Sequence, residues 1–164
     1  MKNEKILWMA RISIVAALYV ALTVISHPFS YDLVQFRISE ALMILVCFDK
    51  RYTWSMVIGC LISNIFSFNL IDCLLGTLAT LLACITMILV KNRFAASFAP
   101  AIFNGVIVGL ELHIILQYPL IYAAASVAFG ELVIVVILGN ILANIINKNK
   151  ALMEIIGIKS LMNK

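Results

Sequence analysis

The chain has 164 residues, of which 64% are hydrophobic and only 12% are Asp, Glu, Lys or Arg. A typical soluble domain carries about 25% charged residues, and the mean hydropathy of +1.10 is too high for a water-facing surface. The net charge of +4 does not indicate a nucleic-acid-binding protein, because the basic residues lie at the ends of apolar runs and form no patch. The composition therefore predicts a single transmembrane domain over residues 1–164, embedded in a lipid bilayer.

Six apolar runs alternate with polar or basic breaks. A bilayer core about 30 Å thick needs about 20 helical residues to cross it. Backbone in hydrocarbon must satisfy its own hydrogen bonds, so we expect helices. The runs cover residues 6–26, 37–48, 52–69, 72–90, 97–117 and 119–146. The second run is short enough to be a tilted or incomplete span.

The basic residues give these spans an orientation. With the N-terminus in the cytoplasm, 11 of the 12 Lys and Arg residues fall on the inner side and only Arg37 falls on the outer side. Cytoplasmic segments of membrane proteins carry such an excess of basic residues. The predicted fold class is therefore an all-α membrane protein, a six-transmembrane-helix bundle with both termini cytoplasmic, placed as a multi-pass protein of the cell membrane.

Ionisable side chains inside the apolar runs gather toward the outer side. Arg37 and Glu40 are three residues apart at the start of the second run, so they share a helical face and could pair. Asp72 begins the fourth run at the same level. Glu111 is expected about 9 Å below the outer end of the fifth run, and Glu131 about 18 Å into the sixth. Charged groups at membrane depth are costly and by default indicate function.

These groups predict a pocket open to the outside. Asn104, Glu111 and Tyr118 recur every seven residues and are expected on one helical face. Simpler roles stay open: Arg37 and Glu40 could only cap each other, and Asp72 could be only a first-turn acid of its helix. A lone buried carboxylate must find a partner or a proton. Candidate substrate-binding residues are Arg37, Glu40, Asp72, Asn104, Glu111 and Glu131.

Small residues also form stripes, which allow helices to approach closely. Packing within the bundle accounts for those of the third and fifth runs, which include Ser55, Gly59, Ser63, Gly105 and Gly109. We interpret the stripe of the first run as a docking face for another membrane subunit. It consists of Ser13, Ala17 and Ala21.

Enzyme motifs such as G-x-S-x-G, H-E-x-x-H and the P-loop do not occur in the sequence. The four cysteines are scattered in or beside apolar runs and are expected to be small buried hydrophobes. Two histidines are too few for most metal sites. Transport by this chain would use a gradient or the energy of partner proteins.

Five stretches, in order, resemble the queuosine-precursor transporter family, QueT. They are V-Q-F-R-I-S-E-A-L at 34–42, G-C-L-I-S-N at 59–64, D-C-L-L-G-T-L-A-T-L-L-A at 72–83, and the pieces at 103–112 and 130–132. The resemblance covers roughly residues 8–140. His113 departs from the aromatic or aliphatic residue expected there.

This resemblance implies a substrate-binding S component of an energy-coupling factor (ECF) transporter. Its implied partners are a transmembrane scaffold, the T component, which the first-helix stripe would contact, and two cytoplasmic ABC ATPases. These partners would use ATP, so we expect no cofactor bound by this chain. The implied substrate is a queuosine precursor, a 7-deazaguanine such as queuine or a preQ-type base.

The guanine edge of such a base offers adjacent N–H donors, which a carboxylate can accept in bidentate fashion. Glu111, Glu131 and Glu40 are the first candidates for this contact, with Asp72 as a further one. Arg37 or Asn104 could bind the ring carbonyl. Aromatic side chains that could stack on the base are Phe36, Tyr31 and Tyr118.

Three alternatives stay open from the residues. One is an S component for another vitamin or base. Another is a solitary ion-coupled carrier with Glu111 and Glu131 as a relay. The third is a membrane-embedded enzyme with paired acids. The polar loop at 28–36 has a length and position suited to a lid over the pocket.

Overall fold

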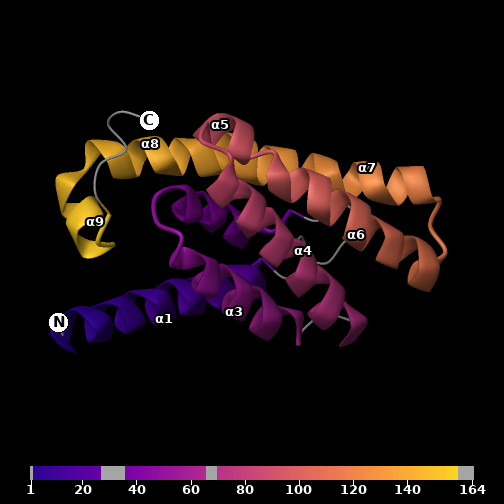
Figure 1. The fold of residues 1–164 in the computed structure, drawn as a ribbon. Coiled ribbons are helices and arrows are strands. Elements are labelled where there is room, and N and C mark those ends of the chain that lie inside the picture. The colour runs from indigo at the N-terminus through magenta and orange to yellow at the C-terminus, as the bar shows by residue number, and fades with distance from the viewer. Residues whose placement is uncertain (1, 27–35, 66–69, 159–164) are drawn as a thin grey trace.

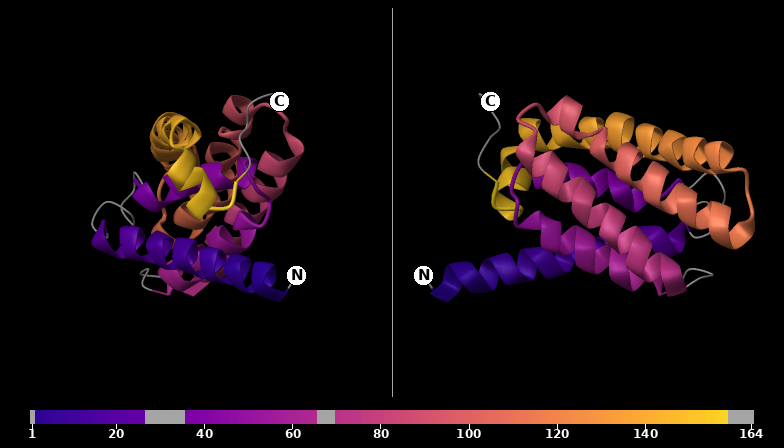
Figure 2. Two further views of the ribbon diagram at one scale, coloured as in Figure 1. Left: turned by 90° about the vertical axis from the view of Figure 1, so that its left-hand side faces the viewer. Right: turned by 45° about the vertical axis from the view of Figure 1, so that its right-hand side comes forward.

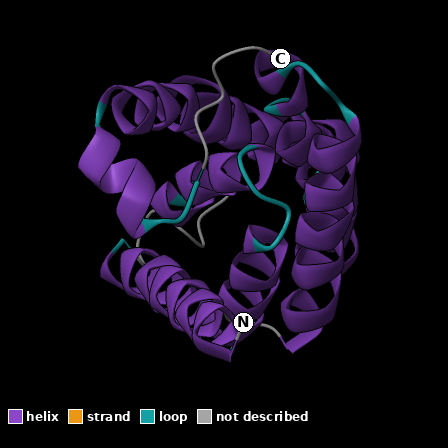
Figure 3. Cartoon of the chain, turned by 60° about the vertical axis from the view of Figure 1, so that its left-hand side comes forward, coloured by secondary structure: helices purple, strands orange, loops and turns teal. Residues whose placement is uncertain are grey.

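The computed structural model describes residues 2–26, 36–65 and 70–158, and within these ranges the chain consists of helices and loops without a strand (Figures 1 and 3). Four helical segments are long and apolar enough to cross a membrane: Asn3–Ile25, Ile71–Leu89, Arg93–Leu116 and Leu120–Lys148. The predicted class, an all-helical multi-pass membrane protein, is thereby confirmed. These segments correspond to the first, fourth, fifth and sixth apolar runs.

The long segments are α1 (Lys2–Ile25), α4 (Leu70–Leu89), α5 (Arg93–Ala96) followed by α6 (Ala99–Leu116), and a final composite helix. The composite helix joins α7 (Leu120–Glu131), the π-helical η2 (Leu132–Gly139) and α8 (Asn140–Lys148). A short α9 (Lys150–Ile155) follows, beyond the last predicted span at 119–146. The side chain of Asn149 caps α9 by accepting a hydrogen bond from the amide of Leu152.

The short second run forms the centre of the bundle. It is a ten-residue 3₁₀-helix, η1 (Ile38–Cys47), in which all residues from 39 to 46 are buried. Its neighbours include α1, α3, α4, α8 and η2, which surround it in the end-on view of Figure 2. A helix that is apolar on all sides is buried rather than amphipathic. At about 2 Å per residue, η1 is about 20 Å long, which is less than the hydrocarbon thickness.

The third run forms α3 (Tyr52–Asn64), which has 13 residues and ends before the predicted limit. The remainder, 66–69, lies outside the described residues, as does most of the loop at 28–36 with Tyr31. Tertiary contacts place α3 between α1 and α4.

Small residues let the helices approach closely. A Cβ atom built on Gly109 of α6 would lie 2.6 Å from the Cα of Ala124 in α7, and one on Gly105 would lie 3.0 Å from the Cβ of Ala128. On α3, a Cβ on Gly59 would lie 2.9 Å from the ring of Tyr19 in α1. The predicted packing role of these glycines is therefore confirmed.

Helix α9 closes the end of the bundle at which α1 begins (Figure 1). The Arg11 guanidinium donates to the carbonyl oxygens of Ile155 at 2.8 Å and Glu154 at 3.1 Å. The hydroxyl of Tyr52 donates to the carbonyl of Ile156 at 2.6 Å. These bonds satisfy carbonyls at the end of α9 and attach it to α1 and α3.

The close α6–α7 contact predicts an asymmetry between two glycines. Gly109→Ala should lower the unfolding midpoint in detergent, because the added methyl group meets backbone atoms that cannot move aside. Gly139→Ala is the matched control, since its Cβ would lie 3.4 Å from the nearest atom, the carbonyl oxygen of Ala41. Both changes raise helix propensity by about 1 kcal/mol. Equal midpoints for the two variants would contradict the close contact.

Candidate functional site

Buried polar side chains from six helices are linked by hydrogen bonds, an ion pair and charge interactions into one group, which includes the start of η1 and the first turn of α4. We call this group the polar cluster. Its members are Tyr19, Arg37, Glu40, Asn64, Asp72, Asn104, Glu111 and Glu131, all of which are at most 6% exposed. The cluster contains every charged or amide residue predicted from the sequence as substrate-binding, together with Tyr19 and Asn64.

An ion pair joins the start of η1 to the first turn of α4. The Nη2 atom of Arg37 lies 3.3 Å from the Oδ2 atom of Asp72, and both side chains are more than nine-tenths buried. The Asn64 amide donates to the main-chain carbonyl of Asp72 at 2.9 Å. Gly76 leaves room for this arrangement, since a Cβ there would lie 2.7 Å from the Asn64 Nδ2 atom and 2.8 Å from the Asp72 Oδ1 atom.

Two further hydrogen bonds hold the glutamates. The hydroxyl of Tyr19 in α1 donates to the Oε1 atom of Glu40 in η1. The amide of Asn104 in α6 donates to the Oε1 atom of Glu131 at 2.5 Å. Glu131 is the last residue of α7, and η2 begins directly after it. Such π-helical segments occur frequently at functional sites.

Each carboxylate of the cluster also has an oxygen without a hydrogen-bond partner in the described part of the chain. These buried atoms are Glu40 Oε2, Asp72 Oδ1, Glu111 Oε2 and Glu131 Oε2. Glu111 lies close enough to Asp72 and Arg37, and Glu131 close enough to Glu40, for their charges to interact. The cluster thus has four carboxylates and one guanidinium. Its carboxylates can accept hydrogen bonds from a ligand rich in N–H groups, or can themselves take up protons.

The spacing of Arg37 and Glu40 suggested that they could pair. Their charges do interact, but their closest partners within the described residues are other groups. Arg37 forms its ion pair with Asp72, while Glu40 bonds to Tyr19. The prediction assumed a continuous helix, but Arg37 has extended backbone angles (φ −78°, ψ 92°) and precedes a 3₁₀-helix. Asp72 lies in the first turn of α4, as expected for a first-turn acid of that helix. It also forms the ion pair with Arg37 from this position.

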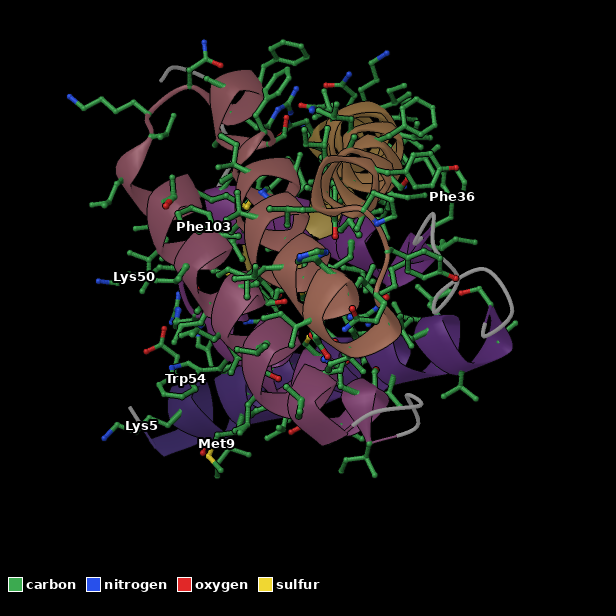
Figure 4. All side chains as sticks on the ribbon, turned by 90° about the vertical axis from the view of Figure 1, so that its right-hand side faces the viewer. Lys5, Met9, Phe36, Lys50, Trp54 and Phe103 are labelled. Carbon is green, nitrogen blue, oxygen red and sulfur yellow. The ribbon has the colours of Figure 1, made fainter. Side chains whose placement is uncertain are left out.

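Two aromatic candidates, Tyr118 and Phe36, lie within the described residues. Helix α6 ends at Leu116 because Gln117 takes a left-handed conformation (φ 58°), so Tyr118 leaves the face of Asn104 and Glu111 and is 38% exposed. The main-chain carbonyl of Tyr118 lies 2.6 Å from His113 Nδ1. Phe36, labelled in Figure 4, packs edge-on against Phe129 of α7 with ring centroids 6.3 Å apart.

The sequence did not indicate that Tyr19 and Cys60 contact the charged groups. Tyr19 lies in the first-helix stretch assigned to docking, yet it is fully buried, and a buried tyrosine hydroxyl needs a partner. Cys60 was predicted to be a small hydrophobe. It is fully buried in the core, as predicted, and its sulfur in addition lies 3.4 Å from Asn64 Nδ2, 3.3 Å from Thr80 Oγ1 and 3.9 Å from Arg37 Nη1.

A helical multi-pass bundle that buries charged groups from several helices is typical of membrane transport proteins. Comparison with known proteins agrees. The profile of the family described as QueT transporter matches residues 9–148. The chain is 35% identical over 147 residues to the Queuosine precursor transporter QueT of Lactococcus lactis subsp. cremoris (strain MG1363), covering 80% of this chain and 87% of that protein. The chain belongs to the QueT transporter family, a family of transporters and not of enzymes. Comparison with solved structures gives no match.

The buried ion pair predicts strong coupling between its two residues. Arg37→Met alone and Asp72→Asn alone should each destabilise the protein by about 3 kcal/mol, because each leaves a buried group without its partner. The double variant should lose much less than the sum. Unfolding in detergent, analysed as a double-mutant cycle, measures this coupling.

The control cycle uses Arg51→Met and Asp49→Asn, which remove a pair with N–O distance 2.6 Å but with the arginine side chain 47% exposed. Exposed pairs contribute about 0–1 kcal/mol. Additive effects at Arg37 and Asp72, equal to those of the control, would contradict a stabilising buried pair.

Proposed function

We propose that this chain is the substrate-binding S component of an ECF transporter that imports a queuosine precursor, such as queuine or a preQ-type base, across the cell membrane. One observation carries the proposal. Four buried carboxylates, each with an oxygen lacking a hydrogen-bond partner in the described part of the chain, lie in one cluster with a single guanidinium, whose charge interacts with each of them. Membership of the QueT transporter family supports the substrate class.

The ligand chemistry suits this excess of acceptors. A 7-deazaguanine has a carbon where guanine has the N7 acceptor, so its ring has several N–H donors and few acceptors. A carboxylate can accept the ring N–H and the exocyclic NH₂ together in bidentate fashion. An amine on the substituent of some precursors would bind a second carboxylate. The acid-rich composition of the polar cluster therefore fits this class of base better than one dominated by carbonyl groups.

The roles of individual residues follow from their positions. Glu111 and Glu131 belong to the adjacent helices α6 and α7 and offer unpartnered oxygens, so they are assigned to the N–H groups. Glu40 and Asp72 are assigned to the remaining donors. Arg37 or Asn104 would bind the ring carbonyl, since both are hydrogen-bond donors held by acidic partners. Phe36 and Tyr118 remain candidates for stacking.

The proposed topology has six spans with both termini in the cytoplasm. Four long apolar helices support four of these spans. The buried η1 and the helix α3 would supply the other two, which gives the even number that the distribution of basic residues requires. In this orientation the start of η1 and the first turn of α4, which carry part of the polar cluster, would lie toward the outside, where the substrate is found.

The proposed partners are the T component and two ABC ATPases. Ser13, Ala17 and Ala21 are all exposed on α1, while Tyr19 on the same helix faces inward. An exposed stripe of small residues supports close packing of α1 against a second membrane subunit. ATP would bind the partner ATPases, and this chain would need no cofactor.

Two alternative functions can be separated from the proposal by their ligand or by the energy source of uptake. An S component for another vitamin or base would share the ATPases but not the ligand. A solitary ion-coupled carrier would use Glu111 and Glu131 as a proton relay. Uptake that stops on removal of the ATPases and resists a protonophore supports the proposal, and the reverse pattern supports the solitary carrier.

Glutamine variants of the acids test the ligand contacts. Glu111→Gln and Glu131→Gln should each weaken queuine binding to the purified protein about tenfold or more, because a hydrogen bond to a charged group contributes about 1.5–3 kcal/mol. Isothermal titration calorimetry measures the effect. Glu154→Gln in α9, at the other end of the bundle, is the matched control. A 7-deazaadenine should bind poorly to the parent, since it lacks the ring N–H beside an NH₂. Unchanged affinity of both glutamine variants would overturn these roles.

Enlarging the α1 stripe tests the partner contact. Ala17→Leu combined with Ala21→Leu should reduce co-purification of a T component and ATPases in mild detergent at least severalfold, because larger side chains hold the helices apart. Queuine binding should be unaffected. Val106→Phe, at a 63% exposed position of α6, adds bulk elsewhere and is the control. Recovery of the same complex with both variants would contradict the docking face.

A further inference from the structure

A cavity with a volume of about 610 Å³ lies at the end of the bundle opposite the polar cluster. It is formed by the loop between η1 and α3, the loop between α4 and α5, and the last turns of α8. Three basic residues line it, Lys50, Lys91 and Arg93, and its lining residues include no acid. The cavity thus has the opposite charge character to the polar cluster.

The positive charges of this cavity are available to a ligand. Lys50 and Lys91 are exposed, and Figure 4 shows Lys50 extending away from the bundle. Arg93 donates to the neutral amide oxygen of Asn144 at 2.9 Å, which leaves its charge uncompensated. Within the described ranges, no carboxylate lies within ion-pair distance of these three side chains.

The neighbouring acid, Asp49, is already engaged. Its carboxylate accepts hydrogen bonds from Arg51 Nε at 2.9 Å and Nη2 at 2.6 Å. Partial burial acts to raise the pKa of Asp49, but the hydrogen bonds from Arg51, the charge of Arg51 and, least of these, the charge of Lys50 outweigh it and hold that pKa below its usual value. Asp49 therefore stays ionised and paired with Arg51 at neutral pH.

One wall of the cavity is apolar and continues onto the outside of the bundle. Lining residues of this wall include Phe48, Met87, Ile88 and Phe94. Phe94 is 57% exposed and Ile88 is 42% exposed, and the adjacent Leu89 is 75% exposed. A free anion gains nothing from such a wall, whereas a lipid would place its headgroup against the basic residues and its acyl chains along the apolar surface.

Asn147 adds a polar group to the lining of the cavity. Its side-chain oxygen is buried without a hydrogen-bond partner in the described part of the chain, and the residue lines the cavity. We propose that this cavity binds an anionic phospholipid with a hydroxyl-bearing headgroup, such as phosphatidylglycerol. Lys50, Lys91 and Arg93 contact the phosphate, and Asn147 accepts a hydrogen bond from a headgroup hydroxyl. The site is separate from the polar cluster and does not depend on the substrate bound there.

Native mass spectrometry of the purified full chain tests the proposal. The protein in detergent is titrated with short-chain phosphatidylglycerol, with phosphatidylcholine as the neutral-headgroup comparison and inorganic phosphate as a competitor. Phosphatidylglycerol should bind at least tenfold more tightly than phosphatidylcholine, and millimolar phosphate should not displace it.

Charge-removing variants locate the site. Lys50→Gln with Lys91→Gln should raise the dissociation constant about 25-fold, since each lysine near an anionic lipid contributes a factor of about five. Lys148→Gln with Lys150→Gln removes equal charge from exposed positions outside the cavity and should have little effect. The single variants Lys50→Gln and Lys91→Gln serve if the double variant does not fold, and Lys91→Arg should retain binding.

Three results would overturn the proposal. Equal binding of the two lipids would remove the role of headgroup charge. An equal loss of lipid affinity in both double variants would mean that the lipid responds to the total positive charge at this end of the bundle and not to the cavity. Saturation by inorganic phosphate with loss of the lipid would identify a free anion as the occupant. Queuine binding should be unchanged in the cavity variants, so failure here is distinguishable from failure of the proposed function.

Discussion

The ion pair between Arg37 and Asp72 sets the geometry on which the polar cluster depends. Each residue lies at the start of its helix, η1 and α4, and each is buried. A charge removed from water must be compensated, so neither helix end could be buried without the other. Fixing these ends also positions Glu40 one turn into η1, where it meets Tyr19. The remaining carboxylates therefore surround a guanidinium whose position is held by α4.

The centre of the bundle follows from the same constraint. A ten-residue 3₁₀-helix is longer than most and has poorer hydrogen-bond geometry than an α-helix. Tertiary packing stabilises this 3₁₀-helix, because its residues from 39 to 46 are buried among the neighbouring helices. The backbone of η1 crosses close to η2, where a Cβ on Gly139 would lie 3.4 Å from the carbonyl of Ala41. The irregular helices η1 and η2 thus pack on each other. Glu40 lies in the first turn of η1, and Glu131 directly precedes η2.

The sequence predicted the helical class and the membership of the polar cluster, because hydropathy and the cost of buried charge act residue by residue. It did not predict which groups pair. The Arg37–Glu40 pairing assumed an α-helical repeat that η1 does not have, and the placement of Tyr118 assumed that α6 continues past Gln117. Tyr19 was missed because its partner, Glu40, is 21 residues away and comes into contact only through tertiary packing. Local periodicity contains no information about such contacts.

The two ends of the bundle have opposite chemistry for separate physical reasons. Carboxylates within the bundle are removed from water, so each must be matched by a donor from the protein, a ligand or a proton, and a ligand that supplies several donors at once is bound selectively. Lysines at the other end remain in contact with water, so they need no internal partner and can be matched by whatever anion the membrane surface offers. In the proposed function, burial would therefore make the polar cluster specific for the arrangement of donors in the substrate. Exposure makes the basic cavity responsive to the charge of the surrounding lipid, and the same chain can carry both properties without one disturbing the other.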